Sequence, residues 1–334
     1  MEVITKAGVY RIPMDTYHTQ LCDGPSFSSS NLRTIYLKSP KDFWAFSALN
    51  PNAFPPKPVS DALIFGRAAH ALILGDEVFA EKFVVLPDDA PPRPDARQIK
   101  AAAAGRVSDS YRERRDYWDA FDTLATGRDV IRKEWLNDIK WMSHALEDDP
   151  RVGPLFDGEA EVSMIWQDAI TGLWLKSRPD MVPRMGDIHA DLKTTADATP
   201  RACLRDVRKM GYAMQLALSA IGSEVLLDQP IRTGVLVFVG KAPPYHVTPV
   251  EVDDEELHWA KLQLRSAIDT AARCLETGIW PGYTAGEIPR YRTPEWEREA
   301  FAEAQKNGTM PRSFFAETPA ADDDDEEDVT DGEG

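Results

Sequence analysis

The stretch RPDMVPRMGDIHADLK, residues 178–193, decides the fold class that we expect for this chain. Leu173–Val182 and Asp187–Leu192 are short, partly alternating runs of apolar residues, and Arg184–Gly186 between them is typical of a turn. Runs of this kind separated by a turn predict neighbouring strands. Ala160–Trp166 is a third such run, so the region predicts a three-stranded meander.

Helical patterns surround these strands. Asp61 lies near the start of an apolar helix that Gly75 ends, and Ala96–Leu146 has the composition and spacing of two or three helices. The later elements that we expect are helical structure at 200–227, buried strands at 234–239 and 245–250, and an amphipathic helix with an acidic first turn at 253–277. This order predicts an α/β fold in which helices cover a mixed sheet.

Asp191 and Lys193 are the first candidates for chemistry. They lie two residues apart on a predicted strand, so both side chains point to the same face. Asp180 belongs to the strand that we expect to pair with theirs, which would bring a second carboxylate alongside. Two acids and a lysine in one pocket are typical of phosphodiester hydrolysis; the alternative is a surface ion-pair cluster at a sheet edge.

Phosphodiester hydrolysis needs a group that neutralises a highly charged transition state and activates water. Mg²⁺, or Mn²⁺ in its place, does both when carboxylates hold it with open coordination positions. Asp180 and Asp191 are the expected ligands, and Lys193 would orient or deprotonate the attacking water.

Four sequence blocks in a fixed order extend this pattern. Gly66–His70 forms G-x-x-x-H, Asp180 follows alone, Asp191–Lys193 forms D-x-K, and Gln215 lies on a later helix. In this order the chain resembles the RecE-type exonuclease VIII nuclease domain, in the RecB-like branch of the PD-(D/E)XK superfamily. The resemblance covers roughly residues 15–285 and implies a restriction-endonuclease-like core, a mixed sheet flanked by helices, with an added N-terminal helical region.

The resemblance also assigns roles to individual residues. His70, Asp180 and Asp191 would bind or position the metal ions, Lys193 would serve the attacking water, and Gln215 would support the site. Glu161 is a weaker candidate ligand and could equally be an outward-facing strand residue. Without the family pattern, His70 would be read as a buried histidine on an apolar helix.

The resemblance has one departure from the family pattern. Ser219 stands where the family has a tyrosine, four residues after Gln215. Tyr212, nearly one helical turn before Gln215, could supply a hydroxyl on the same face.

Two groups of basic residues are candidates for DNA binding. Arg201, Arg205 and Arg208 recur at helical spacing just after the D-x-K strand. A second group lies further upstream and contains Arg93, Arg97 and Lys100. The alternative for both groups is an ordinary solvated helix surface.

The charge of the chain is unevenly distributed. The formal net charge is -17, but nine acidic residues lie in 322–334, and without them the charge is -8. We expect this tail to be disordered, because it repels itself and has little to bury; the alternative is a DNA mimic or a dock for a basic partner. The N-terminus lacks a signal peptide and no apolar run is long enough to span a membrane, so we expect a cytoplasmic protein, in the bacterial host cell if a phage or prophage encodes it.

The expected organisation has four parts. Residues 1–60 form an N-terminal segment packed on the core, and 61–285 form the nuclease domain with a helical insertion at about 95–147. Residues 286–320 form a C-terminal extension, and 321–334 form the acidic tail.

The resemblance implies an exonuclease acting on linear double-stranded DNA ends, with 5′→3′ resection for phage-type recombination beside a single-strand annealing protein. It also allows a ring-shaped homo-oligomer around DNA. One alternative is a catalytically inactive DNA-binding or protein-docking module. The other is a Cas4-like or helicase-associated nuclease, but such proteins commonly carry a four-cysteine cluster or a fused motor, and this chain has three scattered cysteines and no P-loop.

Overall fold

The computed structural model describes residues 3–56, 58–75, 79–160, 162–184, 186–284 and 286–309. The chain divides into two units, residues 1–285 and 286–334. In the described part of the second unit, the regular element is α12 (Glu295–Lys306), which contains no buried residue. The predicted tail at 321–334 lies outside the described residues.

The centre of the first unit is a three-stranded sheet in the order β11-β10-β9. β9 (Ile188–Thr195) pairs in parallel with β10 (Thr233–Gly240), and β10 pairs antiparallel with β11 (Val247–Val252). These strands occupy the predicted positions, and the predicted mixed α/β fold is confirmed.

A second sheet has the order β1-β6-β7-β2. β6 (Ser163–Gln167) and β7 (Trp174–Ser177) are its central, antiparallel pair. β1 (Gly8–Tyr10) and β2 (Ser26–Ser28) add its two edges, so the first thirty residues complete this sheet. Two smaller pairs exist: β3 (Phe83–Leu86) with β4 (Asp129–Arg132), and β5 (Gly158–Ala160) with β8 (Met181–Pro183).

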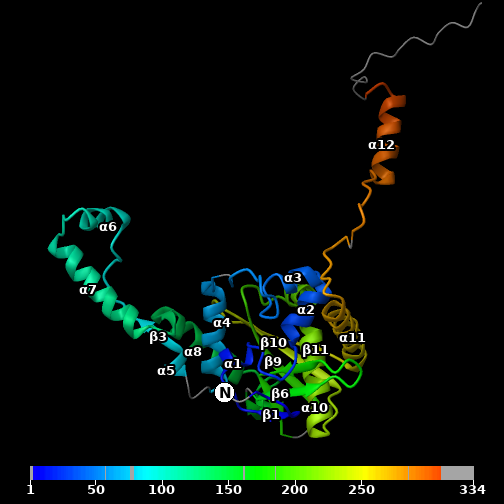
Figure 1. Cartoon of the computed structure of the whole chain (residues 1–334), viewed down its shortest axis with the longest axis horizontal. Coiled ribbons are helices and arrows are strands. Elements are labelled where there is room, and N and C mark those ends of the chain that lie inside the picture. Colours follow the sequence, from blue (N-terminus) through cyan, green and yellow to red (C-terminus); the bar gives the residue numbers. More distant parts are fainter. Residues whose placement is uncertain are drawn as a thin grey trace, which may run out of the picture. The chain divides into compact units, whose positions relative to one another are not determined.

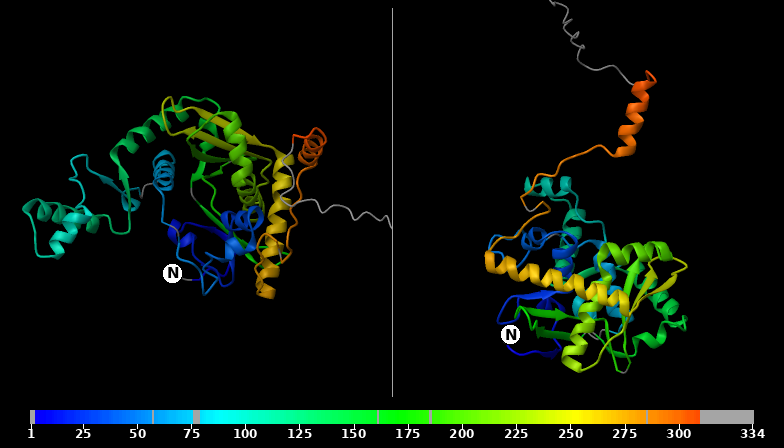
Figure 2. Two further views of the ribbon diagram at one scale, coloured as in Figure 1. Left: turned by 90° about the horizontal axis from the view of Figure 1, so that it is seen from above. Right: turned by 90° about the vertical axis from the view of Figure 1, so that its right-hand side faces the viewer.

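Helices cover both faces of the central sheet (Figure 1). α4 (Asp61–Ile73) and α8 (Lys133–Glu147) pack on one face, where Leu192 and Val237 belong to their apolar cluster. α10 (Tyr212–Leu227) and α11 (Asp254–Thr277) cover the other face with Leu236 and Phe238. Figure 2 shows α2 (Ser29–Leu37) beside the long α11, so the N-terminal segment joins the same core.

The remaining helices are shorter or lie outside this core. Their bounds are α1 Met14–Tyr17, α3 Pro40–Trp44, α5 Phe79–Lys82, α6 Ala96–Ala103, α7 Asp109–Leu124 and α9 Pro200–Met210, with a 3₁₀ turn at Gly153–Phe156. Within the described residues no single helix has the length and apolar composition to cross a membrane. α9 and α10 together have this length and composition, but they are bent by 65° relative to each other.

The predicted meander is wrong. β6 and β7 pair as expected, but the segment with Asp180 does not pair with β9, because β8 takes β5 as its partner. Pro179 follows β7 closely, and proline has no N–H to donate to a ladder, so the pairing ends there. β9 pairs instead with β10, which lies about 45 residues later in the chain.

Gly211 divides the helical stretch predicted at 200–227 into α9 and α10. Its φ of 64° lies in the left-handed region that favours glycine. An added Cβ would also lie 2.8 Å from Leu37 Cδ1 of α2. The break places Tyr212 at the first position of α10, where it faces the central sheet and packs with Phe238.

His189 gives the fold a measurable pH dependence. It is 1% exposed on β9, and its Nε2 lies 3.0 Å from the Ser223 hydroxyl of α10. Burial lowers the pKa of His189 to about 4. The unfolded chain therefore binds a proton below a pH of about 6.5 while the folded chain stays neutral, which favours unfolding.

We predict that the free energy of unfolding falls as the pH drops from 6.5 to 4, and that His189 contributes about 3 kcal/mol to this fall. His189→Gln should reduce the slope, because glutamine can still bond Ser223 but does not titrate. Urea unfolding at several pH values measures it, with the exposed His258→Gln as control. Parallel curves for wild type and His189→Gln would contradict the assignment.

Candidate active site

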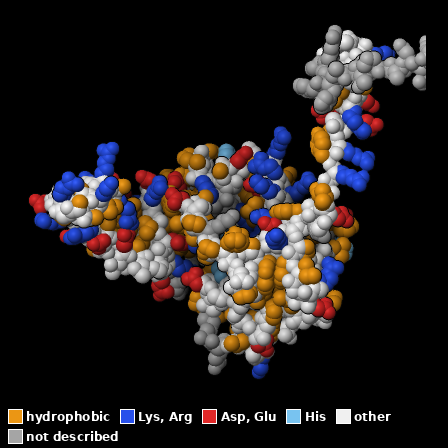
Figure 3. All heavy atoms as spheres, turned by 45° about the horizontal axis from the view of Figure 1, so that its top comes forward, with side chains coloured by type: hydrophobic (Ala, Val, Ile, Leu, Met, Phe, Trp, Pro, Cys, Tyr) orange, Lys and Arg blue, Asp and Glu red, His pale blue; other side chains and the backbone are white. Residues whose placement is uncertain are grey.

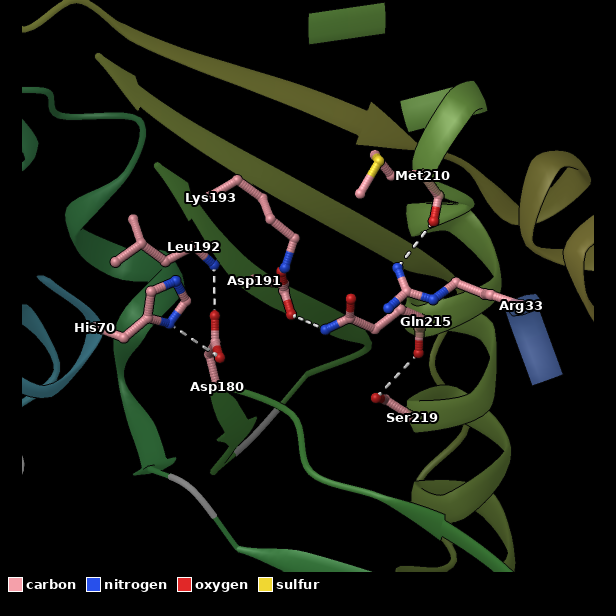
Figure 4. Close-up of polar contacts among 9 residues, drawn as sticks. All are labelled: Arg33, His70, Asp180, Asp191, Leu192, Lys193, Met210, Gln215 and Ser219. Atoms are coloured by element: carbon pink, nitrogen blue, oxygen red, sulfur yellow. Dashed lines mark hydrogen bonds and ion pairs between the residues drawn. The ribbon is translucent and has the colours of Figure 1, made fainter. Parts of the chain in front are cut away.

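Asp191 lies at the centre of the candidate site and is 2% exposed. One carboxylate oxygen accepts a hydrogen bond from Gln215 Nε2 at 2.7 Å, and the other is ion-paired with Lys193 Nζ (Figure 4). Burial raises the pKa of Asp191, and the nearby Asp180 raises it further. The carboxylate is therefore surrounded by donors but remains poorly solvated.

Asp180 reaches the same site from the bend between β7 and β8. Its Oδ2 accepts the backbone N–H of Leu192 at 2.6 Å, and its Oδ1 lies 3.5 Å from His70 Nδ1. Burial would raise the pKa of Asp180, but His70 and the Leu192 N–H outweigh it and lower the pKa. The prediction that Asp180 lies beside the D-x-K strand is thus met by a side-chain contact with β9 and not by strand pairing.

His70 projects from α4 toward Asp180. Burial opposes its protonation, but the charge of Asp180 raises the pKa of His70 overall. His70 therefore has an acidic partner on the far side of the site.

Lys193 lies two residues after Asp191 on the same face of β9. Burial works against its charge, yet Asp191 and Asp180 together raise the pKa of Lys193. Its Nζ also lies 4.8 Å from the centre of the Tyr212 ring. The amine is therefore held in its charged form, as a hydrogen-bond donor.

Three alternate side chains of β9 contact α10. His189 faces Ser223, Asp191 faces Gln215, and Lys193 faces Tyr212. The helix runs in the opposite direction to the strand, and the partners step back along α10 by eight residues and then by three. This arrangement brings Gln215 and Tyr212, both predicted from the sequence, to the D-x-K residues.

Ser219 lies between these contacts but faces elsewhere. It is 3% exposed, and its hydroxyl lies 2.7 Å from the Ser177 hydroxyl at the end of β7. Ser219 therefore connects α10 to the second sheet. The ring of Tyr212 lies beside Lys193.

The basic residues predicted to bind DNA lie outside this cluster. Arg201, Arg205 and Arg208 are exposed on α9, and Arg205 contacts Asp206. Arg97 and Lys100 are exposed on α6. Acidic and basic side chains are mixed in the α6–α7 region, at the left of Figure 3.

Arg93 is occupied by contacts of its own. Both its Nη atoms bond the Asp122 carboxylate, and its guanidinium lies 4.0 Å from the centre of the Trp118 ring. These contacts connect the loop before α6 to α7, and DNA binding by Arg93 stays a prediction.

Arg33 is a neighbour of the site that the sequence did not single out. Its Cζ lies 5.7 Å from the centre of the Tyr212 ring, and its charge interacts with Asp191. Its contacts with Met210 and Tyr212 join segments about 180 residues apart, so no local pattern marks it.

The site fits a divalent cation by its donor chemistry. Mg²⁺ is usually bound by one or two carboxylates together with waters and substrate phosphates, and two carboxylates are present here. The effect of Asp180 on the pKa of Asp191 means that the two acids repel each other, which a cation would relieve. Among the described residues, no three acidic, histidine or cysteine side chains form a metal-binding group; Glu161, the weaker candidate, lies outside those residues.

We predict that Ser219→Tyr destabilises the protein by about 1–3 kcal/mol or more, because a phenol must be accommodated where a buried hydroxyl pair lies. Ser219→Ala, which only removes the hydroxyl, should cost about 1 kcal/mol. Chemical unfolding at pH 7 measures both. A tyrosine variant as stable as wild type would mean that position 219 faces solvent or substrate.

Comparisons with known proteins agree with this fold. A family described as "PDDEXK-like domain of unknown function (DUF3799)" matches residues 28–294. The structure of a "Putative exonuclease" from Eubacterium rectale is 13% identical, with a TM-score of 0.50, and the match covers 87% of this chain and 99% of that one. The structure of SSO0001 is 17% identical over 61% of this chain and 85% of that one, but its TM-score of 0.26 is too low to bear on the fold.

No curated protein matches the sequence. The RecE-type placement within the superfamily stays a prediction. The family match spans β6 and β7 of the second sheet, the whole central sheet and every residue of the site described above, whereas β1 lies before it. The chain therefore belongs to this PDDEXK-like family, and through it to the PD-(D/E)XK superfamily.

Proposed function

We propose that this protein is a metal-dependent exonuclease that hydrolyses phosphodiester bonds of linear double-stranded DNA. The observation that carries the proposal is the convergence of Asp180, Asp191 and Lys193 at one point of β9, with His70 and Gln215 bonded to the two acids. A surface ion-pair cluster does not account for it, because the side chains of Asp191 and Lys193 are only 3% and 13% exposed.

Each side chain has a distinct task in this proposal. Asp180 and Asp191 would hold the metal ion, with His70 fixing the orientation of Asp180. When bound, the ion supplies a Lewis acid for the phosphate and lowers the pKa of a water molecule. Lys193 donates a hydrogen bond to the attacking water or to a phosphate oxygen, and Gln215 keeps Asp191 in place.

We propose Mg²⁺ as the resident ion, with Mn²⁺ as a substitute. Both are hard cations that prefer oxygen ligands, and carboxylates are the acidic donors of this site. The three cysteines support this choice over an iron–sulfur enzyme of the Cas4 kind, since Cys22, Cys203 and Cys274 are each free and buried.

The finer parts of the proposal rest on the sequence resemblance. These are attack on duplex ends, 5′→3′ resection, phage-type recombination beside a single-strand annealing protein, and a ring-shaped homo-oligomer around DNA. The Eubacterium rectale protein is described as a "Putative exonuclease", which is compatible with attack on DNA ends.

We predict that the wild type degrades linear duplex DNA in Mg²⁺ or Mn²⁺, leaves closed circular DNA intact, and is inactive in EDTA. Asp191→Ala should lower the rate by at least 1000-fold, because it removes a proposed metal ligand and the partner of Lys193. Gel assays with end-labelled substrates measure rate and polarity together.

Asp187→Ala is the matched control, because this acid precedes the same strand but lies outside the cluster. Cleavage of circular DNA would indicate an endonuclease. Binding of DNA without cleavage under any metal would favour the catalytically inactive module.

The arginines of α9 give a second prediction. Arg201, Arg205 and Arg208 follow β9 directly and are exposed, so replacing all three with alanine should weaken DNA binding. The slope of log affinity against log salt should become shallower by about 3, since each phosphate contact contributes about 0.9. Fluorescence anisotropy in EDTA measures this slope.

A matched control removes three exposed arginines from the second unit, Arg290, Arg292 and Arg298. An equal loss of slope in the control would show that only net charge matters. An unchanged slope in the α9 variant would exclude these arginines from the DNA-binding surface.

A further inference from the structure

Arg33 brings a second cation to the tyrosine that Lys193 contacts. Its guanidinium lies 5.7 Å from the centre of the Tyr212 ring, and Lys193 Nζ lies 4.8 Å from the same point. Arg33 comes from α2, in the N-terminal segment, whereas Tyr212 begins α10. Figure 4 shows the guanidinium directed from α2 toward Gln215 and Asp191.

Two backbone carbonyls fix the orientation of Arg33. Its Nε donates to Ser29 O at 3.3 Å, and its Nη1 donates to Met210 O at 2.9 Å. Met210 ends α9, and carbonyls at a helix C-terminus attract cations. A guanidinium has five N–H donors, so three remain, including both on Nη2.

The remaining donors have no acidic partner in contact. Among the described residues, no carboxylate lies within ion-pair distance of Arg33, although the charge of Asp191 acts on it from further away. A partly buried guanidinium without an ion-pair partner costs free energy, because the protein replaces only part of its hydration. The guanidinium, held against Tyr212, can therefore gain from binding the anionic group of a ligand.

The geometry of the unused N–H donors indicates which kind of anion Arg33 would bind. A guanidinium presents parallel N–H groups that match two oxygens of a phosphate, which an ammonium cannot do. A strand whose scissile phosphate reaches Lys193 would pass Arg33 with an adjacent phosphate, because both cations contact Tyr212.

We propose that Arg33 binds a backbone phosphate of the DNA strand next to the scissile phosphate, so that the N-terminal segment supplies a substrate-binding residue to the site. This inference rests on the proposed nuclease function. It makes Arg33 a positioning residue for the strand and Tyr212 the platform that holds it. It also predicts that a lysine cannot replace Arg33 fully.

The test measures binding of short linear duplexes in EDTA by anisotropy, and cleavage of the same duplexes in Mg²⁺. Arg33→Gln should weaken binding and kcat/KM by about 10- to 100-fold, the range expected for one charge-assisted contact, and the salt slope should become shallower by about 1. Arg33→Lys should keep the salt slope of wild type but recover only part of the affinity. Arg11→Gln, which changes an exposed surface arginine, should match wild type.

A set of duplexes that carry one neutral methylphosphonate each identifies the phosphate. At one position near the cleaved bond, the neutral group should weaken binding to wild type by about 10-fold but leave binding to Arg33→Gln unchanged. The proposal is overturned if the two changes are additive at every position, or if Arg33→Gln binds and cleaves like wild type.

The outcomes also separate this inference from the function on which it rests. Wild-type protein that neither binds nor cleaves DNA would defeat both. Normal wild-type cleavage with an unaffected Arg33→Gln would defeat this inference alone. Thermal unfolding of each variant shows whether it is folded. If Arg33→Gln does not fold, the test uses Arg33→Lys, which keeps the aliphatic part of the side chain against Tyr212.

Discussion

The hydrogen bond from the Leu192 N–H to the Asp180 carboxylate is the contact on which the site depends. β9 is an edge strand of the central sheet, with β10 on one side, so its other edge has free backbone donors. Asp180 takes one of them and thereby brings a carboxylate from a bend onto the strand that carries Asp191. A bond to the backbone fixes the position of Asp180 relative to β9 more firmly than an ion pair between two flexible side chains would. His70, which projects from α4, contacts the other oxygen of the Asp180 carboxylate.

The buried charges of the site are hard to explain by stability. Asp180, Asp191, Lys193 and His70 are all largely removed from water, and such groups usually cost more in lost hydration than their mutual attraction returns. The chain nevertheless surrounds them with well-packed aliphatic clusters on both faces of the sheet. Shifted pKa values of several neighbouring groups in one pocket are typical of functional sites, because the pocket is arranged for chemistry at the expense of stability. The charge of Asp180 raises the pKa of Asp191, and a bound cation would reduce this repulsion between the two carboxylates.

How far the sequence could predict this site depended on the range of each contact. The period of two along β9 put Asp191 and Lys193 on one face, and the helical period put Tyr212 on the same face as Gln215; both are local rules, and both agree with the structure. Gln215 itself was predicted from the order of the motif blocks. The strand partner of β9 was beyond such rules, since parallel pairing with β10 joins segments separated by two helices. The short strands β3 and β4 were missed for the same reason. The pairing of Arg93 with Asp122, 29 residues away, was likewise beyond local rules.

The position of the N-terminal segment was also beyond prediction from local patterns. Its strands β1 and β2 lie at the two edges of the second sheet, and its helix α2 packs on α10 and α11. None of these contacts is local in sequence, so the segment looked like an addition to a core that began at Asp61. In the structure it closes the side of the site formed by Tyr212 and Gln215, where Gly211 leaves no room for a side chain against Leu37. A rigid contact there requires both helices, which is why a residue before position 60 can present its charge to Asp191 in a fixed orientation.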